Sequence, residues 1–230
     1  MPRFFFPTPL RASVLLSLSL SILASAPHQL RAQVARLYPV DEAARDPSFL
    51  AFRSRLIQAL QERDEMFLLG VLAPDIKSSF GGDAGVEDFK SFWELDQPDT
   101  AVWKTLLTVL SLGGSFQGDN YFIAPYTNSE FPSSLDAFEH GVILGEHVEA
   151  RKEPGEDGAI LAVLSSDIVR VSDWTPLIDP RDQREWIAVE LAGGIRAFVL
   201  REQLRSPIDY RAFFEKKNDK WLLTIFVAGD

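Results

Sequence analysis

The sequence predicts an α+β fold in which a helical region comes first and short strands follow. Between residues 46 and 112 the apolar residues recur every three or four positions, which is the spacing of one buried helix face. After residue 115 they form short apolar runs separated by turn residues, which is the pattern of strands. Because helices precede strands instead of alternating with them, α+β is favoured over a doubly wound sheet.

The composition is that of a globular protein and excludes several classes of function. Of the 230 residues, 46% are hydrophobic and 24% are charged, which supports a packed core. The formal net charge is -10 and no strong basic patch appears, so we expect no nucleic-acid partner. The chain has no cysteine, which excludes a lipobox, disulfides, thiolate zinc sites and cysteine nucleophiles.

Residues 1–32 are interpreted as a signal peptide. Two arginines precede Ser13–Leu23, an uncharged run of 11 residues that is too short to span a bilayer as a helix. Small residues allow cleavage after Ala26 or after Ala32. We therefore expect an exported protein, periplasmic or extracellular, without a membrane span in the mature chain. An uncleaved N-terminal anchor is the alternative interpretation.

Residues 33–45 are expected to be a linker and residues 46–117 a helical region. Asp46 followed by Pro47 predicts a helix start, since an acidic N-cap and proline in the first turn are both favoured there. Three further helices are expected in this region. They cover 65–73, which Pro74 would end, then 86–93, and a last helix that begins after Asp99 or Thr100 and stops at Gly113-Gly114.

Residues 118–207 are expected to form a domain of short strands with long loops. The expected strands are 121–124, 142–144, two within 159–171, 186–191 and 197–200. Gly193-Gly194 separates the last two and predicts a hairpin.

Residues 208–230 are expected to form a C-terminal β-hairpin. Its second strand, Trp221 to Val227, is apolar on both faces and should therefore lie inside a sheet. A lone hairpin is marginally stable in water, so we expect it to pack on the helical region. This helix-plus-hairpin unit resembles the nuclear-transport-factor-like cone fold, and residues 118–207 would then be an insertion.

A family resemblance covers residues 140–207. Its motifs, in chain order, are Val148-Glu149-Ala150-Arg151 with Pro154, Ala159–Leu164, Asp167–Val171, Trp186-Ile187-Ala188-Val189, Gly193-Gly194, Ala197-Phe198-Val199 and Leu204. This order resembles the bacterial SH3-like domain, a small β-barrel of exported proteins. Two departures are Ala197, where that family usually has glycine, and the long connection Ser172 to Glu185. The resemblance implies a binding role in the cell envelope, with a peptidoglycan-related peptide or a protein as the partner.

Four residues are candidates for ligand binding. Trp174, Tyr126 and Phe198 could line a groove on or beside the barrel, since aromatic faces pack well on peptide side chains. Trp174 is the best exposed candidate because it lies in the long loop, whereas barrel core is the alternative role for Phe198. Arg151 could hold a carboxylate with its guanidinium fork, or form a structural ion pair.

No assembled catalytic motif is present. The chain has neither Gly-x-Ser-x-Gly nor His-Glu-x-x-His, and His140 and His147 are the only histidines after residue 32. We therefore expect no catalytic residue, no metal and no cofactor, and a non-catalytic envelope binding module. One alternative is a hydrolase-type enzyme or a small-ligand-binding cone-like domain with a pocket near Phe80–Gly82. The other is a purely structural assembly protein.

Overall fold

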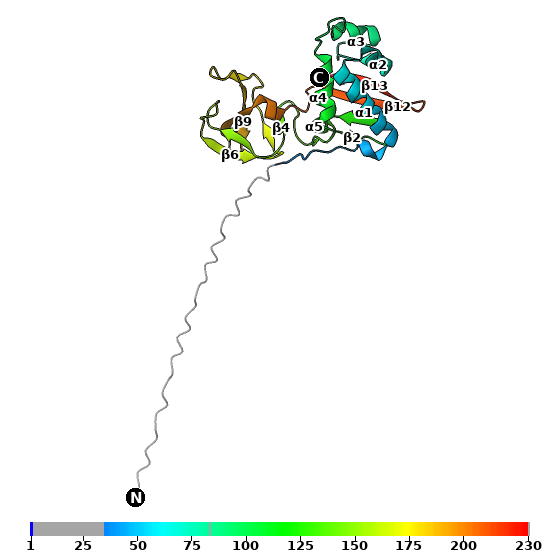
Figure 1. Ribbon diagram of the computed structural model, residues 1–230. Coiled ribbons are helices and arrows are strands. Elements are labelled where there is room, and N and C mark those ends of the chain that lie inside the picture. Colours follow the sequence, from blue (N-terminus) through cyan, green and yellow to red (C-terminus); the bar gives the residue numbers. More distant parts are fainter. Residues whose placement is uncertain (2–34, 83, 230) are drawn as a thin grey trace. The chain divides into compact units, whose positions relative to one another are not determined.

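The computed structural model describes residues 1, 35–82 and 84–229, so almost all of the predicted signal peptide lies outside the described residues. The described part of the chain is mostly β (Figure 1). Its described residues form thirteen strands in two sheets and five α-helices. The predicted α+β fold with a separate helical region is therefore wrong. Helices occur in residues 46–117, but strands from that region join the first sheet.

Local sequence signals set where the longest helix begins. The Asp46 carboxylate accepts hydrogen bonds from the backbone N–H groups of Ser48 and Phe49, at 2.7 and 3.2 Å. It thereby satisfies two donors that the first helical turn leaves free. The helical elements are η1 (Ala43–Arg45), α1 (Pro47–Glu62), α2 (Glu65–Gly70), α3 (Val86–Phe92), α4 (Val102–Ser111), α5 (Tyr126–Ser129) and η2 (Arg201–Gln203).

The first sheet has five strands in the order β1-β13-β12-β3-β2. Their bounds are β1 (Leu72–Lys77), β2 (Ser115–Phe116), β3 (Tyr121–Ala124), β12 (Arg211–Lys217) and β13 (Lys220–Val227). β13 lies between β1 and β12, which confirms that the last apolar strand is inside a sheet. The first two residues of β1, Leu72 and Ala73, were expected to end a helix; β1 is instead an edge strand parallel to β13. Pro74 is tolerated because an edge strand has one side without ladder bonds.

An aromatic core joins α1 to this sheet. The Phe49 ring, fully buried, lies 4.2 Å from that of Phe122 on β3 and 4.8 Å from that of Trp221 on β13, centroid to centroid. Phe214 on β12 contacts it edge-on at 5.7 Å. Burying one such side chain stabilises the fold by about 1.5–3 kcal/mol. The N-terminal helix and the C-terminal hairpin therefore share one core.

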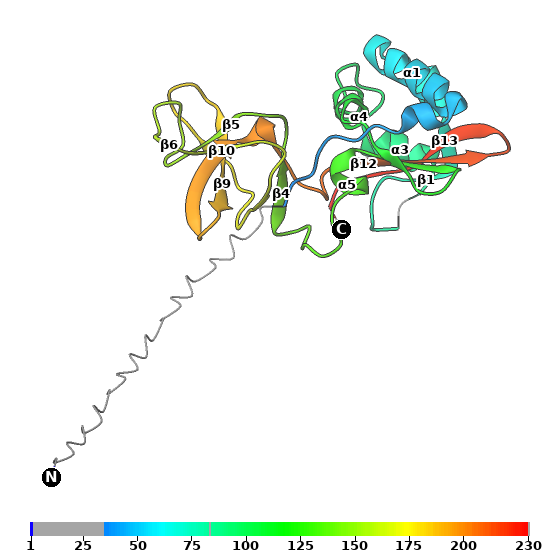
Figure 2. The same cartoon turned by 90° about the horizontal axis from the view of Figure 1, so that it is seen from below.

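The second sheet has eight strands, with the path β11-β4-β7-β9-β10-β5-β6 and β8 paired to β9. Their bounds are β4 (His140–Ile143), β5 (Val148–Arg151), β6 (Ile160–Leu164), β7 (Ile168–Arg170), β8 (Leu177–Ile178), β9 (Glu185–Leu191), β10 (Ile195–Leu200) and β11 (Leu204–Arg205). Figure 2 shows β4, β5, β6, β9 and β10 of this sheet gathered together. In the described residues β11 and β6, the ends of the path, do not pair with each other, whereas a small closed barrel was predicted.

The β9–β10 hairpin separates two apolar surfaces. Ile187 and Val199 are paired in register and belong to the main core of this sheet. Trp186 and Leu200 are also paired, and with Ala188 and Phe198 they form a small cluster of their own. Because successive side chains of a strand point to opposite faces, this cluster lies on the face away from the main core. Trp186 and Leu200 on this second face line the clefts of the candidate site.

Candidate functional site

The four predicted binding residues do not converge on one site. Trp174 is half-buried against the core of the second sheet, and its Nε1 donates a hydrogen bond to the Phe138 carbonyl at 3.2 Å. A Cβ built on Gly141 would lie 2.9 Å from Cη2 of the indole, so the ring packs closely on that strand. Much of the Trp174 surface is therefore used in packing.

Tyr126 is almost completely buried in a cluster with Leu37, Val142 and Ile168. Burial raises the pKa of its hydroxyl, and the nearby Arg205 guanidinium opposes that shift. In this position the Tyr126 ring is part of a core.

Arg151 and Phe198 are directly opposite each other on β5 and β10. Phe198 is 8% exposed, and the Arg196 guanidinium lies 5.2 Å from its ring centroid. Arg151 donates to the Gly158 carbonyl at 2.8 Å and pairs with the Glu149 carboxylate. Both side chains therefore lie on the same face of the sheet as Trp186 and Leu200, and Arg151 also lines a cleft there.

This cleft has a volume of about 180 Å³. It is lined by His147, Glu149, Arg151, Glu156, Arg184, Trp186, Leu200 and Gln203. A neighbouring cleft of about 410 Å³ shares Arg184 and Leu200 with it and is otherwise lined by Gln183, Glu185, Arg201 and Glu202. We call these two clefts together the Trp186 groove.

Trp186 lines the groove and carries a hydrogen-bond donor that has no acceptor in the described structure. Its side chain is 2% exposed, and its buried Nε1 has no hydrogen-bond partner in the described structure. A buried N–H without an acceptor costs about 1–3 kcal/mol, so such a group calls for an explanation. Trp186 is not among the four binding residues predicted from the sequence, because its strand position suits barrel core as well as a groove. The alternation along β9, with Trp186 and Ala188 on one face, is the signal that could have found it.

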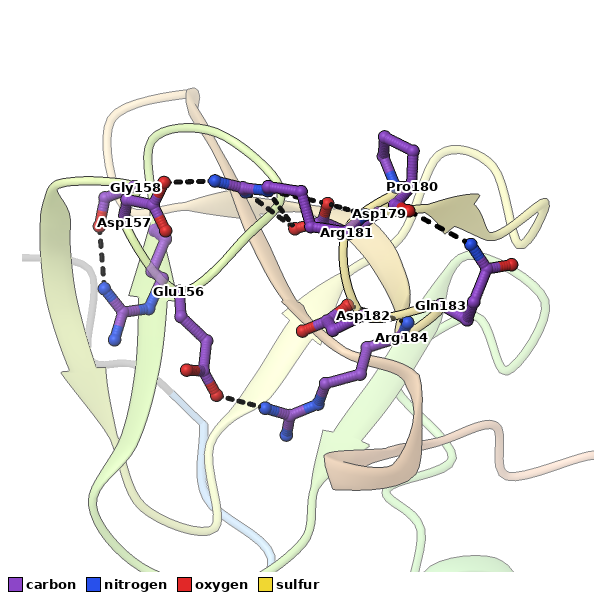
Figure 3. Close-up of polar contacts among 10 residues, drawn as sticks. Glu156, Asp157, Gly158, Asp179, Pro180, Arg181, Asp182, Gln183 and Arg184 are labelled. Atoms are coloured by element: carbon purple, nitrogen blue, oxygen red, sulfur yellow. Dashed lines mark hydrogen bonds and ion pairs between the residues drawn. The ribbon is translucent and has the colours of Figure 1, made fainter.

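Two loops at one end of the groove are joined by ion pairs, as Figure 3 shows. Arg181 pairs with Asp157 and also holds Asp179 with two nitrogens, its Nη2 lying 2.6 Å from Oδ2. Arg184 pairs with Glu156 across the same pair of loops. The Arg181 hydrogen bonds lower the pKa of Asp179 to about 2 although its side chain is only 3% exposed. The loops 152–159 and 179–184 are therefore held together beside the groove.

The groove carries both signs of charge. Arg151, Arg184 and Arg201 bring guanidinium groups, and four glutamates line it as well, Glu149, Glu156, Glu185 and Glu202. The Arg184–Glu202 pair is long, at 3.4 Å, and the Glu202 side chain is 76% exposed. Exposed pairs of this kind are worth about 0–1 kcal/mol and exchange partners at little cost. The arrangement can accept a ligand with both amino and carboxylate groups.

The predicted pocket near Phe80–Gly82 stays a hypothesis. Phe80 is 56% exposed, and the Arg211 guanidinium lies 5.5 Å from its ring centroid. Ser78 is buried and its Oγ has no hydrogen-bond partner in the described structure. Asp83 lies outside the described residues.

His140 and His147 have separate surroundings. His140 Nδ1 lies 2.8 Å from the Asp136 carbonyl oxygen, whereas His147 lines the Trp186 groove. Among residues 35–82 and 84–229, no group of three or more histidine or acidic side chains is placed to hold a metal ion. In the same residues no helix combines the length and apolar character needed to cross a bilayer.

Comparison with known proteins finds no family model, no curated protein and no solved structure that matches this chain.

Proposed function

We propose that this protein is a non-catalytic binding protein of the cell envelope that takes a short peptide segment in the Trp186 groove. The observation that carries the proposal is the buried, unpartnered indole N–H of Trp186 in a groove lined by charged side chains. A ligand carbonyl or carboxylate oxygen would supply the missing acceptor, and an indole N–H usually finds one when buried.

The charged lining supports a peptide with free ends or charged side chains. Arg151 has a planar fork of five N–H donors, of which the carbonyl of Gly158 and the carboxylate of Glu149 use only part. Such a fork binds a carboxylate with two parallel hydrogen bonds. The Glu202 side chain is mostly exposed, so its carboxylate can pair with an amino group of the ligand.

The resemblance of residues 140–207 to the SH3-like family and the interpretation of residues 1–32 as a signal peptide belong to the same proposal. They motivate the choice of a peptidoglycan-related peptide, or a segment of an envelope protein, as the ligand. Export is tested by fractionating cells that express the tagged full chain or a chain lacking residues 1–32. We expect only the full chain outside the cytoplasm, and equal distribution of the two would refute export.

Binding is tested by calorimetric titration with a soluble peptidoglycan digest and with a synthetic peptide that carries both amino and carboxylate groups. Trp186→Phe keeps the aromatic ring and removes the N–H. It should weaken binding about 3- to 10-fold, the value of one hydrogen bond. Trp174→Phe is the matched control, since the Trp174 N–H already has the Phe138 carbonyl as acceptor. If neither probe binds, or if only Trp174→Phe weakens binding, the groove is not the site.

A further inference from the structure

A separate cleft, beside the first sheet, is lined by aromatic and acidic side chains. Its volume is about 370 Å³, and its lining residues are Phe92, Trp93, Glu94, Gln97, Asp99, Thr100, Ala101 and Tyr210. Clefts that take small ligands measure about 300–1,000 Å³. The residues come from the end of α3, the connection to α4 and the segment before β12, so only the fold brings them together.

The aromatic side chains of this cleft form a connected set. Phe92, 50% exposed, meets Trp93 edge-on with ring centroids 5.4 Å apart. Tyr210 lies 5.0 Å from Trp93 on the same measure. The fully buried Phe226 ring stacks on Trp93 at 5.0 Å with an interplanar angle of 19°, so the indole is held in place by the core. Aromatic faces carry partial negative charge and attract cations.

The charged groups that line the cleft are all acidic. Glu94 is exposed and, in the described structure, makes no ion pair, whereas Asp99 pairs with Arg63 at 2.9 Å. None of the lining residues is basic. A cationic ligand would therefore find a carboxylate without a competing partner beside exposed aromatic surface.

The indole of Trp93 adds an independent observation. Trp93 is 6% exposed, and its buried Nε1 has no hydrogen-bond partner in the described structure. The Trp93 carbonyl, by contrast, already accepts a hydrogen bond from the Thr100 hydroxyl. Trp93 also lines the cleft, so a ligand oxygen that reaches this donor would remove the cost of leaving it unpaired.

We propose that this cleft binds a small organic ammonium ion that also carries a hydroxyl oxygen. The ammonium group lies against the Phe92 and Tyr210 rings beside the Glu94 carboxylate, and the hydroxyl oxygen accepts from Trp93 Nε1. Amines with alkyl substituents suit the site because their charge is spread over an apolar surface that packs on aromatic rings.

The proposal is tested by NMR titration of the protein with three small probes. Choline has both features, tetramethylammonium lacks the oxygen, and 3,3-dimethylbutan-1-ol has the shape of choline without its charge. The indole N–H signal of Trp93 is assigned by its loss in Trp93→Phe. Choline should saturate and move this signal downfield. Tetramethylammonium should bind with a smaller shift there, and the uncharged alcohol should bind at least 5-fold more weakly than choline.

Two variants test whether the Glu94 carboxylate and the Phe92 ring contact the ligand. Glu94→Gln and Phe92→Leu should each weaken choline binding about 2- to 5-fold, the range of one exposed charge or cation–π contact. Phe80→Leu is the matched control, because Phe80 is exposed to a similar degree, 56%, but does not line the cleft, and it should leave the affinity unchanged. Equal affinity for choline and the uncharged alcohol would overturn the proposal. So would an unmoved Trp93 signal at saturating choline, or no saturation by choline at all.

Discussion

The Nζ of Lys216 lies 3.2 Å from Oδ2 of Asp46, 170 positions earlier in the chain. Asp46 caps α1, and Lys216 is near the end of β12, so one ion pair ties the first long helix to the C-terminal hairpin. Trp221 adds a second tie, since its Nε1 donates to the Ser48 hydroxyl at 3.0 Å. The start of the helix is therefore held by local and by long-range contacts.

This arrangement predicts an acid-sensitive contribution to stability. Hydrogen bonds from the Ser48 side chain, then from Lys216 and the backbone, lower the pKa of Asp46 from 3.8 to about 2. Because the folded-state pKa is the lower one, the carboxylate stabilises the fold fully above about pH 4. That contribution is lost as the pH falls through about 2.

Two substitutions at Asp46 separate capping from charge. Asp46→Ala should cost about 1 kcal/mol at pH 7, the usual value of a lost N-cap, measured by denaturant unfolding. Asp46→Asn keeps a capping oxygen and should lose less stability at pH 7. Its unfolding free energy should also change less than that of the wild type between pH 4 and pH 2. If the two proteins respond identically to acid, the Asp46 charge has no such role.

The shared aromatic core predicts a large effect at Phe49. Phe49→Ala should lower the unfolding free energy by about 3–5 kcal/mol, because the ring is fully buried among rings of β3, β12 and β13. Leu50→Ala, one position along the same helix at a residue 39% exposed, is the control and should cost far less. Similar losses for the two variants would mean that α1 does not pack as described.

A close backbone approach predicts that Gly114 cannot be replaced. A Cβ at this position would lie 2.1 Å from the Ile123 carbonyl oxygen, and the backbone φ of +155° is strained for other residues. Gly114→Ala should therefore destabilise the protein by about 2–4 kcal/mol. The backbone φ of Gly193 is also positive, +83°, but a Cβ at this position would meet no atom within 4 Å. Thermal melting should rank Gly193→Ala as the milder change, and the reverse order would refute the clash.

The loop ion pairs predict a local effect beside the Trp186 groove. Arg181→Ala should lower the melting temperature and speed proteolysis within residues 152–159 and 179–184. It leaves the buried Asp179 carboxylate without its guanidinium partner. Arg184→Ala removes a pair whose acid, Glu156, is 67% exposed, and should have a smaller effect. Unchanged cleavage rates in Arg181→Ala would show that the loops are held by other contacts.

Much of the local structure follows from short sequence patterns. Asp46-Pro47 marks the start of α1 because the capping carboxylate and the N–H groups it binds are only two and three residues apart. The β9–β10 turn follows from Gly193-Gly194, both with positive φ. The β12–β13 turn follows in the same way from Asn218 and Asp219. Of the four predicted binding residues, Arg151 lines the Trp186 groove and Phe198 lies in its neighbouring cluster, whereas Tyr126 is core and Trp174 packs elsewhere.

The sequence by itself determined where helices and hairpins begin and turn, because capping and turn geometry act over a few residues. Only the tertiary structure decided the sheets: Leu72 pairs with Leu223 in parallel, a partnership that no local pattern encodes. The tertiary structure also decided where clefts form, since Trp93 and Tyr210 meet only after the chain has folded. Hydrophobic burial specifies that an aromatic residue leaves water, whereas the partners it packs against are chosen by the whole chain.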